Sequence, residues 1–130
     1  MLNLTGRPPA DTRSEAAQRT LTSALLQAAA LLGVAQAQLA AVLGVSPATV
    51  SRMASGAYLL QPDRKEWQLA VLFVRLFRSL DSITGGRDDL SRAWFQSHNH
   101  GLHGKPEELV NDVESFVRVV HYLDASRALV

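Results

Sequence analysis

Residues 36–56 read QAQLAAVLGVSPATVSRMASG, and this stretch decides the fold that we expect for the chain. Gly44 suits a turn with positive φ, and Ser46-Pro47 is typical of a helix start in which serine caps the first turn. The pattern therefore predicts two short helices, over residues 35–43 and 47–56, that pack near a right angle as a helix-turn-helix. The residues expected to hold the two helices together are Leu39, Ala40, Leu43, Gly44, Val45, Val50 and Met53.

The outward side of the second helix is the part of a helix-turn-helix that reads the major groove of DNA. Arg52 is the only charged residue between Leu31 and Leu60, whereas affinity for DNA depends largely on neutralised phosphates. Specific binding would then need a dimer or more arginines, and a helical hairpin that never touches DNA remains the alternative. The expected DNA contacts are Gln36, Ser46, Ala48, Thr49, Ser51 and Arg52, and the additional basic residues are Arg7, Arg13, Arg19, Arg64 and Lys65.

Helical spacing of apolar residues extends in both directions from this motif, and no alternating strand pattern is found in the sequence. We predict an all-α chain with further helices over residues 12–33, 62–83 and 89–97, a short turn over 106–110, and a last helix ending near Ala128. Thr12 and Glu15 have the spacing of a capping box for the first of these. The apolar face of the last helix is expected to be Val113, Phe116, Val117, Val120 and Leu123. The regions are a flexible arm (1–11), a helix-turn-helix region (12–60), a central helix (61–84) and a C-terminal helical region (85–130).

The composition excludes several classes of protein. The chain has 130 residues, of which 47% are hydrophobic and 19% charged, as in a globular domain. Without cysteine there is no disulfide framework, thiol nucleophile or cysteine zinc site. Residues 1–10 lack the apolar segment of a signal peptide, and no apolar run is long enough to span a bilayer, so we expect a cytoplasmic protein without membrane contact.

The charges are divided unevenly along the chain. Residues 1–80 hold eight Lys/Arg and four Asp/Glu (net +4), whereas residues 81–130 hold five and eight (net −3). This division suggests two different partners, with chance scatter as the alternative. Residues 69–77 are apolar nearly all round, which predicts either a dimer interface through Phe73 and Phe77 or a central core helix.

The segment from Ala93 reads AWFQSHNHGLHGKPEELVNDVESFVRVVHYLD. Together with the preceding helix-turn-helix, it resembles the Xre/MbcA/ParS-type antitoxins with their C-terminal toxin-binding domain, over about residues 34–130. Two positions depart from the family pattern: residues 111–114 lack a glycine, and His103-Gly104 replaces a glycine pair. The resemblance rests on Trp94, Asn99, Leu102, Gly104, Pro106 and Leu109 in this order, followed by Val117, Tyr122 and Leu123.

The resemblance implies a dimeric antitoxin whose residues 85–130 bind and block a cognate toxin. In this family the toxin is commonly a RES-domain protein that degrades NAD or transfers ADP-ribose from it, and many members repress their own operon. The last residues are thought to obstruct the NAD pocket, so we expect residues 125–130 to leave the body of the protein, with a frayed terminus as the alternative. The implied toxin-binding residues are Trp94, Asn99, Leu102, Gly104, Tyr122, Arg127, Leu129 and Val130.

Other chemistries are disfavoured by the sequence. His98, His100 and His103 suggest a metal site, but no cysteine or carboxylate nearby completes a ligand set. No motif joins a nucleophile to a base, and Gly85-Gly86 lacks the lysine of a phosphate loop. We therefore expect no metal, cofactor or catalytic residue, and no enzyme. The competing interpretation is a dimeric helix-turn-helix regulator without a toxin partner.

Overall fold

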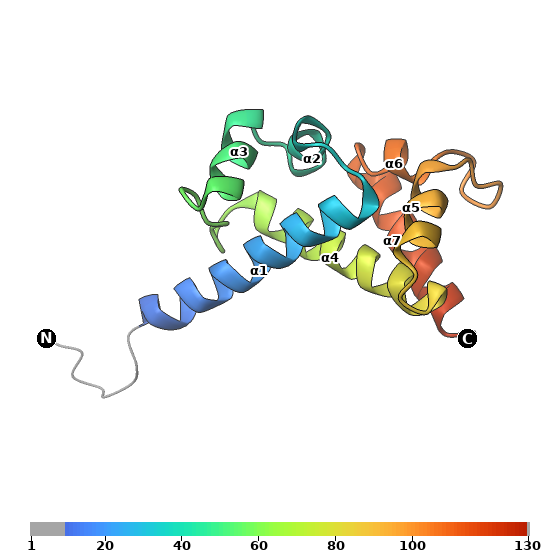
Figure 1. Cartoon of the computed structure of the whole chain (residues 1–130), viewed down its shortest axis with the longest axis horizontal. Helices are drawn as coiled ribbons and strands as arrows, with labels where there is room; N and C mark the ends of the chain where they lie inside the picture. The colour runs from blue at the N-terminus through green and yellow to red at the C-terminus, as the bar shows by residue number, and fades with distance from the viewer. Residues whose placement is uncertain (1–9, 130) are drawn as a thin grey trace, which may run out of the picture.

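The computed structural model describes residues 10–129, with side chains from residue 14 onward. Within this range the secondary structure is helical apart from one isolated backbone bridge, which confirms the all-α class. The elements in chain order are α1 (Ala10–Leu32), α2 (Gln36–Leu43), α3 (Pro47–Ser55), α4 (Lys65–Thr84), α5 (Asp88–Gln96), α6 (Pro106–Leu109) and α7 (Val113–Arg127) (Figure 1).

Helix α1 ends where the sequence predicts but begins earlier. It starts at Ala10, so Thr12 lies inside the helix and the predicted capping box is wrong. Glu15 instead accepts a hydrogen bond from Arg19, one turn later, at 2.8 Å. Gly33 ends the helix with a φ of 74°, and a Cβ at this position would lie 2.8 Å from Gln96 Nε2. The part of the predicted arm over residues 1–9 lies outside the described residues.

Helices α2 and α3 form the predicted helix-turn-helix. Gly44 adopts a left-handed conformation with a φ of 72°, which turns the chain between the two helices. Ser46 caps α3, and Pro47 occupies its first position. Leu39, Ala40 and Val50 are no more than 2% exposed and form the contact between the helices and the core.

Helix α4 begins three residues later than predicted because residues 61–64 form a turn, in which the Arg64 N–H donates to the Gln61 carbonyl at 3.1 Å. Phe73 is fully buried within the chain, so the prediction of a dimer interface through this residue is wrong and α4 is a core helix. Phe77 is half-buried and packs against the same core.

The apolar face of α7 was only partly predicted. Phe116, Val120 and Leu123 are buried as expected, whereas Val113 is 58% exposed. Val117 is half-buried, and the fully buried residue next to it is Val119. Asp112 caps the start of α7, since its side chain accepts a hydrogen bond from the Ser115 N–H, and the helix runs from Val113 to Arg127. Residues 125–127 are therefore helical, in line with the predicted helix end near Ala128, so a tail that leaves the body would begin after Arg127 and stays a prediction.

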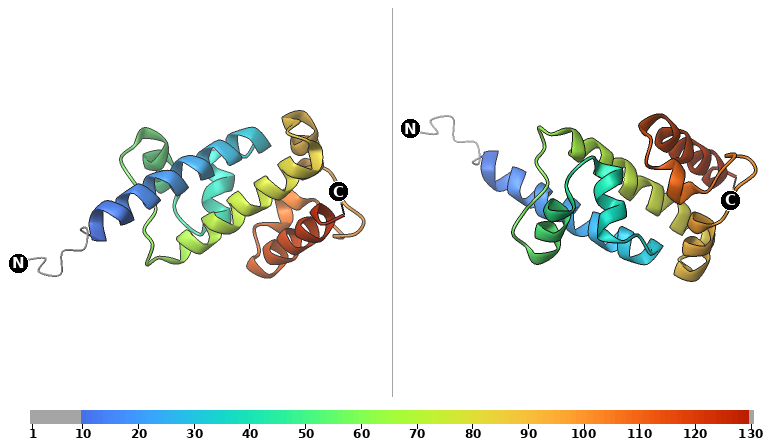
Figure 2. Two further views of the ribbon diagram at one scale, coloured as in Figure 1. Left: turned by 90° about the horizontal axis from the view of Figure 1, so that it is seen from below. Right: turned by 90° about the horizontal axis from the view of Figure 1, so that it is seen from above.

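One hydrophobic core connects the two halves of the chain. Helix α4 lies between α1 and α7 and contacts both (Figure 2). The ring of Phe73 packs edge-on against Phe95 of α5 and Phe116 of α7, with ring centroids 6.3 Å and 6.4 Å away. Such edge-to-face pairs add to the free energy gained from burying the rings. Among residues 10–129, no helix combines the length and apolar character needed to cross a bilayer.

Candidate functional site

The outward face of α3 carries a short chain of hydrogen-bonding side chains. The Thr49 N–H donates to Ser46 Oγ at 3.1 Å, and the two hydroxyl groups share a hydrogen bond of 2.9 Å. Arg52 Nη2 donates to Thr49 Oγ1 at 3.2 Å. These residues follow one another every three positions, so they line one side of the helix beside exposed Ala48 and Ser51. This side presents the hydroxyl groups of Ser46 and Thr49 at the start of α3 and the positive charge of Arg52 in its last turn.

A hollow of about 540 Å³ adjoins this face, and it brings in residues from beyond the motif. Ser46 and Thr49 form one wall, while Tyr58 and Arg64 lie on the other. The Tyr58 hydroxyl donates to Glu66 Oε2 at 2.6 Å, which ties the segment after α3 to the start of α4. Burial, followed by the hydrogen bond and negative charge of Glu66, raises the pKa of Tyr58 above its ordinary value. Arg64 thus stands beside the reading helix as a second positive group.

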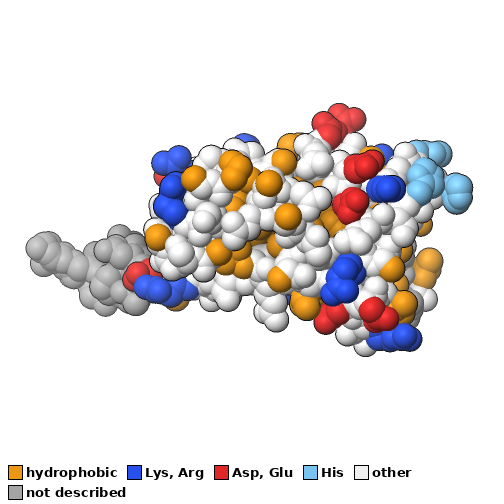
Figure 3. Space-filling view, turned by 45° about the horizontal axis from the view of Figure 1, so that its top comes forward, with side chains coloured by type: hydrophobic (Ala, Val, Ile, Leu, Met, Phe, Trp, Pro, Cys, Tyr) orange, Lys and Arg blue, Asp and Glu red, His pale blue; other side chains and the backbone are white. Residues whose placement is uncertain are grey.

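Few charges are found on the surface around the helix-turn-helix. Figure 3 shows this surface as mainly uncharged, with positive side chains at both ends and with most of the acidic side chains and the histidines toward the end opposite the N-terminus. Arg19 is paired with Glu15. Arg7 and the side chain of Arg13 lie outside the described part of the structure. Gln36 is exposed at the start of α2, where it borders a separate hollow with Ala54 of α3.

The C-terminal helices assemble an aromatic surface from residues 28 positions apart. Trp94 of α5 and Tyr122 of α7 stack with ring centroids 6.4 Å apart and an angle of 24° between the rings. Tyr122 remains 37% exposed. Gly101 lies against this pair, since a Cβ there would be 3.0 Å from Tyr122 Cε1. We call Trp94, Tyr122 and Gly101 the aromatic surface.

The loop between α5 and α6 is closed by its own backbone. The Asn99 N–H donates to the Gly104 carbonyl at 2.9 Å, and the Gly104 N–H donates back at 3.3 Å. Asn99 Oδ1 also accepts a hydrogen bond from the Leu102 N–H at 3.0 Å. His103, at the family's first glycine position, has a φ of 59°. The histidine thus adopts the conformation that glycine would adopt more easily.

Several residues of the family motif support this surface from inside. Leu102 is 1% exposed, and its carbonyl accepts a hydrogen bond from Arg118 Nη1 at 3.0 Å. Gly104 packs against Leu109, and its Cβ would lie 3.3 Å from Leu109 Cδ2. Leu102 and Gly104 therefore fix the shape of the loop, whereas the exposed edge of Tyr122 can meet a partner. No glycine is needed over residues 111–114, where Asp112 caps α7.

The end of α7 is anchored rather than free. Asp124 accepts hydrogen bonds from Ser79 Oγ at 2.8 Å and from Arg75 Nη2. Partial burial raises the pKa of Asp124, but the hydrogen bonds from Ser79 and Arg75 outweigh this effect and hold the pKa below its ordinary value. Leu129 is 88% exposed, and Val130 lies outside the described residues.

The histidine cluster does not assemble into a ligand set within residues 14–129. The rings of His98 and His100 meet edge-on with centroids 5.0 Å apart, but no group of three His, Cys, Asp or Glu residues that could hold a metal ion occurs in this part of the chain.

Two family models match the chain. The antitoxin Xre-like helix-turn-helix domain matches residues 11–75, and the antitoxin Xre/MbcA/ParS C-terminal toxin-binding domain matches residues 79–128. The chain belongs to the Xre/MbcA/ParS antitoxin family. Among solved structures, this antitoxin is similar to a chain of the M. tuberculosis MbcT-MbcA toxin-antitoxin complex, with 26% sequence identity and a TM-score of 0.63. The match covers 85% of this chain and 96% of that chain. A comparison with curated proteins gave no match.

Within the antitoxin, the first family model covers α1 to α3 and the first half of α4, and the second covers α5 to α7. Sequence reasoning did not find the Tyr58–Glu66 hydrogen bond or the Trp94–Tyr122 stack as pairs. Both join segments that meet only in the folded chain, so no local pattern could have shown them. Arg64 was named from its charge, but its place beside Ser46 and Thr49 comes from the structure.

Proposed function

We propose that this antitoxin binds and inhibits a RES-type, NAD-consuming toxin through its C-terminal domain and represses its own operon through α3. The match of the toxin-binding family model to residues 79–128 carries the proposal. The similar chain comes from a structure described as a toxin-antitoxin complex, which supports a toxin partner for this chain as well. Operator binding would place the protein in the cytoplasm with the DNA.

The aromatic surface is the proposed centre of the toxin interface. Tyr and Trp are the residue types that contribute most to binding energy in protein interfaces, because they bury large areas at a small entropy cost. The stack with Trp94 fixes the Tyr122 ring, and Asn99 shapes the adjoining loop. The net charge of −3 over residues 81–130 would favour a basic toxin surface.

The segment after α7 is the proposed blocking element. Leu129 is almost wholly exposed, and the residues before it are held by Asp124. A short apolar end projecting from an anchored helix could enter a nucleotide pocket without loosening the rest of the domain. Arg127 is five residues after Tyr122, which turns it by about 140° around the helix. We therefore assign the blocking role to Leu129 and Val130 and not to Arg127.

For operator recognition, Thr49, Ser51 and Arg52 are the proposed base-reading residues, with Ser46, Gln36 and Arg64 near phosphates. One copy supplies few positive charges, so specific binding should use a dimer on half-sites about 34 Å apart. Arg52→Ala should weaken promoter binding in a gel-shift assay without changing toxin binding. Arg87→Ala, which removes a charge outside the helix-turn-helix, is the matched control.

The decisive experiment for toxin binding is co-expression with the product of the neighbouring gene. Wild-type antitoxin should restore growth and co-purify with the toxin. Tyr122→Ala should weaken co-purification, whereas Leu90→Ala, which also removes an exposed apolar side chain, should not. If the neighbouring product neither depletes NAD nor binds the antitoxin, a dimeric DNA-binding regulator without a toxin partner becomes the better interpretation.

A further inference from the structure

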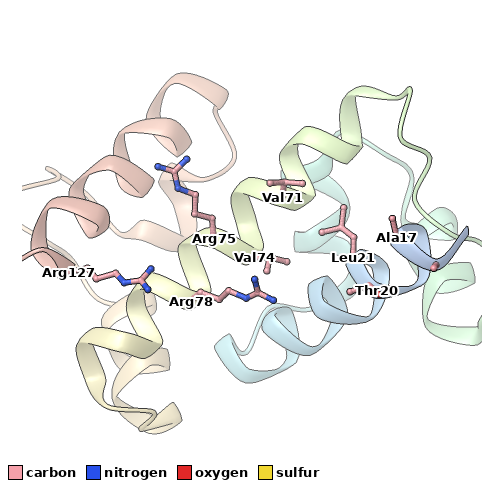
Figure 4. Close-up of a pocket in the computed structure, with 9 residues that line it drawn as sticks. Ala17, Thr20, Leu21, Val71, Val74, Arg75, Arg78 and Arg127 are labelled. Atoms are coloured by element: carbon pink, nitrogen blue, oxygen red, sulfur yellow. The ribbon is translucent and has the colours of Figure 1, made fainter. Parts of the chain in front are cut away.

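A groove of about 520 Å³ runs between α1 and α4 and reaches the end of α7. Its floor is apolar and is formed by Ala17 and Leu21 of α1 with Val71 and Val74 of α4 (Figure 4). Figure 2 shows α2 and α3 on one side of the pair α1 and α4, and Figure 4 shows the residues that line the groove from the other side. It therefore faces away from the DNA that α3 would read, and the operator does not explain it.

Arginines from two helices line one end of this groove. Arg78 of α4 and Arg127 of α7 line it, and Figure 4 shows Arg127 extending toward Arg78. Arg75 also borders the groove, but its guanidinium pairs with Asp124. Within residues 14–129, neither Arg78 nor Arg127 has an acidic partner within ion-pair distance. Both side chains are exposed, so each guanidinium is open to an anion from solvent.

We propose that this groove binds a small amphipathic anion. A hydrocarbon or aromatic body of the ligand would cover Leu21, Val71 and Val74, and a carboxylate or phosphate head would lie between Arg78 and Arg127. The volume falls within the range of small-molecule sites, which are mostly apolar with a few polar groups that fix the orientation. Guanidinium groups suit both kinds of head, because they donate two parallel hydrogen bonds to carboxylate or phosphate oxygens.

A second copy of the chain is a poorer occupant. A symmetric contact through this groove would bury Arg78 and Arg127 of each copy against the apolar lining of the other copy, because a twofold axis exchanges the two ends of the groove. The lining contains no acidic residue, so neither charge would gain a partner there. The ligand would instead connect α1 and α4 to the end of α7. Its binding would thus stabilise the position of the segment after α7 relative to the helix-turn-helix region.

Isothermal titration calorimetry with the full chain tests the proposal, using octanoate and octyl phosphate as probes. At least one probe should bind, and the tighter of the two identifies the preferred head. Octyltrimethylammonium tests the need for negative charge, and acetate and inorganic phosphate test the need for the apolar body. All three should bind at least tenfold more weakly. The proposal would be overturned if the cationic probe bound as tightly as the octyl anions, or if acetate or inorganic phosphate did. It would also be overturned if neither octyl anion bound.

Variants locate the site. Arg78→Gln combined with Arg127→Gln should weaken probe binding about tenfold or more, because the charged hydrogen bonds to the head of the probe are lost. Arg87→Gln combined with Arg92→Gln removes the same charge from exposed positions outside the groove and should leave the affinity unchanged. Ala17→Phe should also weaken binding by filling the floor. Equal affinity in the two double variants would show that the probe binds elsewhere. Circular dichroism confirms that each variant is folded.

Discussion

At the scale of single residues, Asp124 fastens the last helix to the central one. Its carboxylate accepts hydrogen bonds from Ser79 and Arg75 of α4, so a group near the end of the chain is held by the middle of the protein. The folded-state pKa lies below the ordinary value of 3.8. Stability from this group is therefore present above pH 3.8 and is lost as the pH falls through the lowered pKa.

Asp124→Asn tests this contact. The variant should lose about 1 kcal/mol of unfolding free energy at pH 7, because one charged acceptor of two hydrogen bonds is replaced by a neutral amide. The difference from the wild type should shrink as the pH falls below 3.8, because the carboxyl group of the unfolded chain is protonated first and the native one at its lowered pKa. Urea unfolding at pH 7 and pH 3 measures both values, with Asp63→Asn in an exposed turn as the control. A difference independent of pH would mean that charge is not the cause.

His103 offers a second test at this scale. A left-handed conformation costs a non-glycine residue roughly 1–2 kcal/mol, while glycine adds roughly 0.5–1 kcal/mol of chain entropy on folding. His103→Gly should therefore stabilise the protein by about 0.5 kcal/mol, and His103→Val should destabilise it, since a β-branched residue fits this conformation poorly. Thermal unfolding tests this by comparing the melting temperatures of both variants with that of the wild type. A lower melting temperature for His103→Gly would show that the imidazole itself stabilises the loop.

At the scale of elements, the proposed binding of the toxin and the proposed blocking of its pocket depend on different residues, on the two sides of the end of α7. Deletion of residues 128–130 leaves α7, Asp124 and the aromatic surface in place. The shortened antitoxin should still co-purify with the toxin, yet NAD consumption should return, because the proposed blocking residues are gone. Leu129→Ser offers a milder version of the same change. Full inhibition by the shortened chain would favour coverage of the toxin surface over obstruction of its pocket.

The ends of the helices show what the sequence could and could not predict. Gly33, Ser46 and Gly85 mark boundaries correctly, because a positive φ or a capping hydroxyl is a local property. Thr12 and Pro62 mark boundaries wrongly. Thr12 lies within α1, and Pro62 lies in the turn before α4, although both are residue types that often begin a helix. Phe73 was ambiguous for a different reason: an apolar helix must be covered, but the sequence does not say by what. Here α1, α5 and α7 cover α4.

The same distinction applies to the candidate site. The recognition helix was predictable from residues 36–56, since its glycine, serine and proline act through neighbouring backbone. Tyr122 was taken from the family motif, but its stack on Trp94 depends on how α5 and α7 meet. The burial of Leu102 likewise depends on the closed loop, so its supporting role came only from the structure.

At the scale of the whole molecule, the single core predicts one cooperative unfolding transition. A fragment of residues 61–130 keeps α4 to α7 but removes α1, which covers one side of α4. We expect this fragment to be unfolded or to self-associate, whereas residues 10–130 should unfold cooperatively as a control. Urea unfolding followed by circular dichroism, together with light scattering, distinguishes these outcomes. A monomeric fragment with a sharp transition would show that the C-terminal half holds its own core.

The packing of Phe73 against Phe95 and Phe116 has a consequence for inheritance. The two matched regions meet between residues 75 and 79, so Phe73 belongs to one region while its two ring partners belong to the other. A gene recombined at that junction would encode Phe73 from one parent, and the positions of Phe95 and Phe116 would come from the other parent. Under the proposed function, operator choice and toxin choice would therefore be transmitted to descendants as a single trait, unless the incoming sequence already supplies a matching ring.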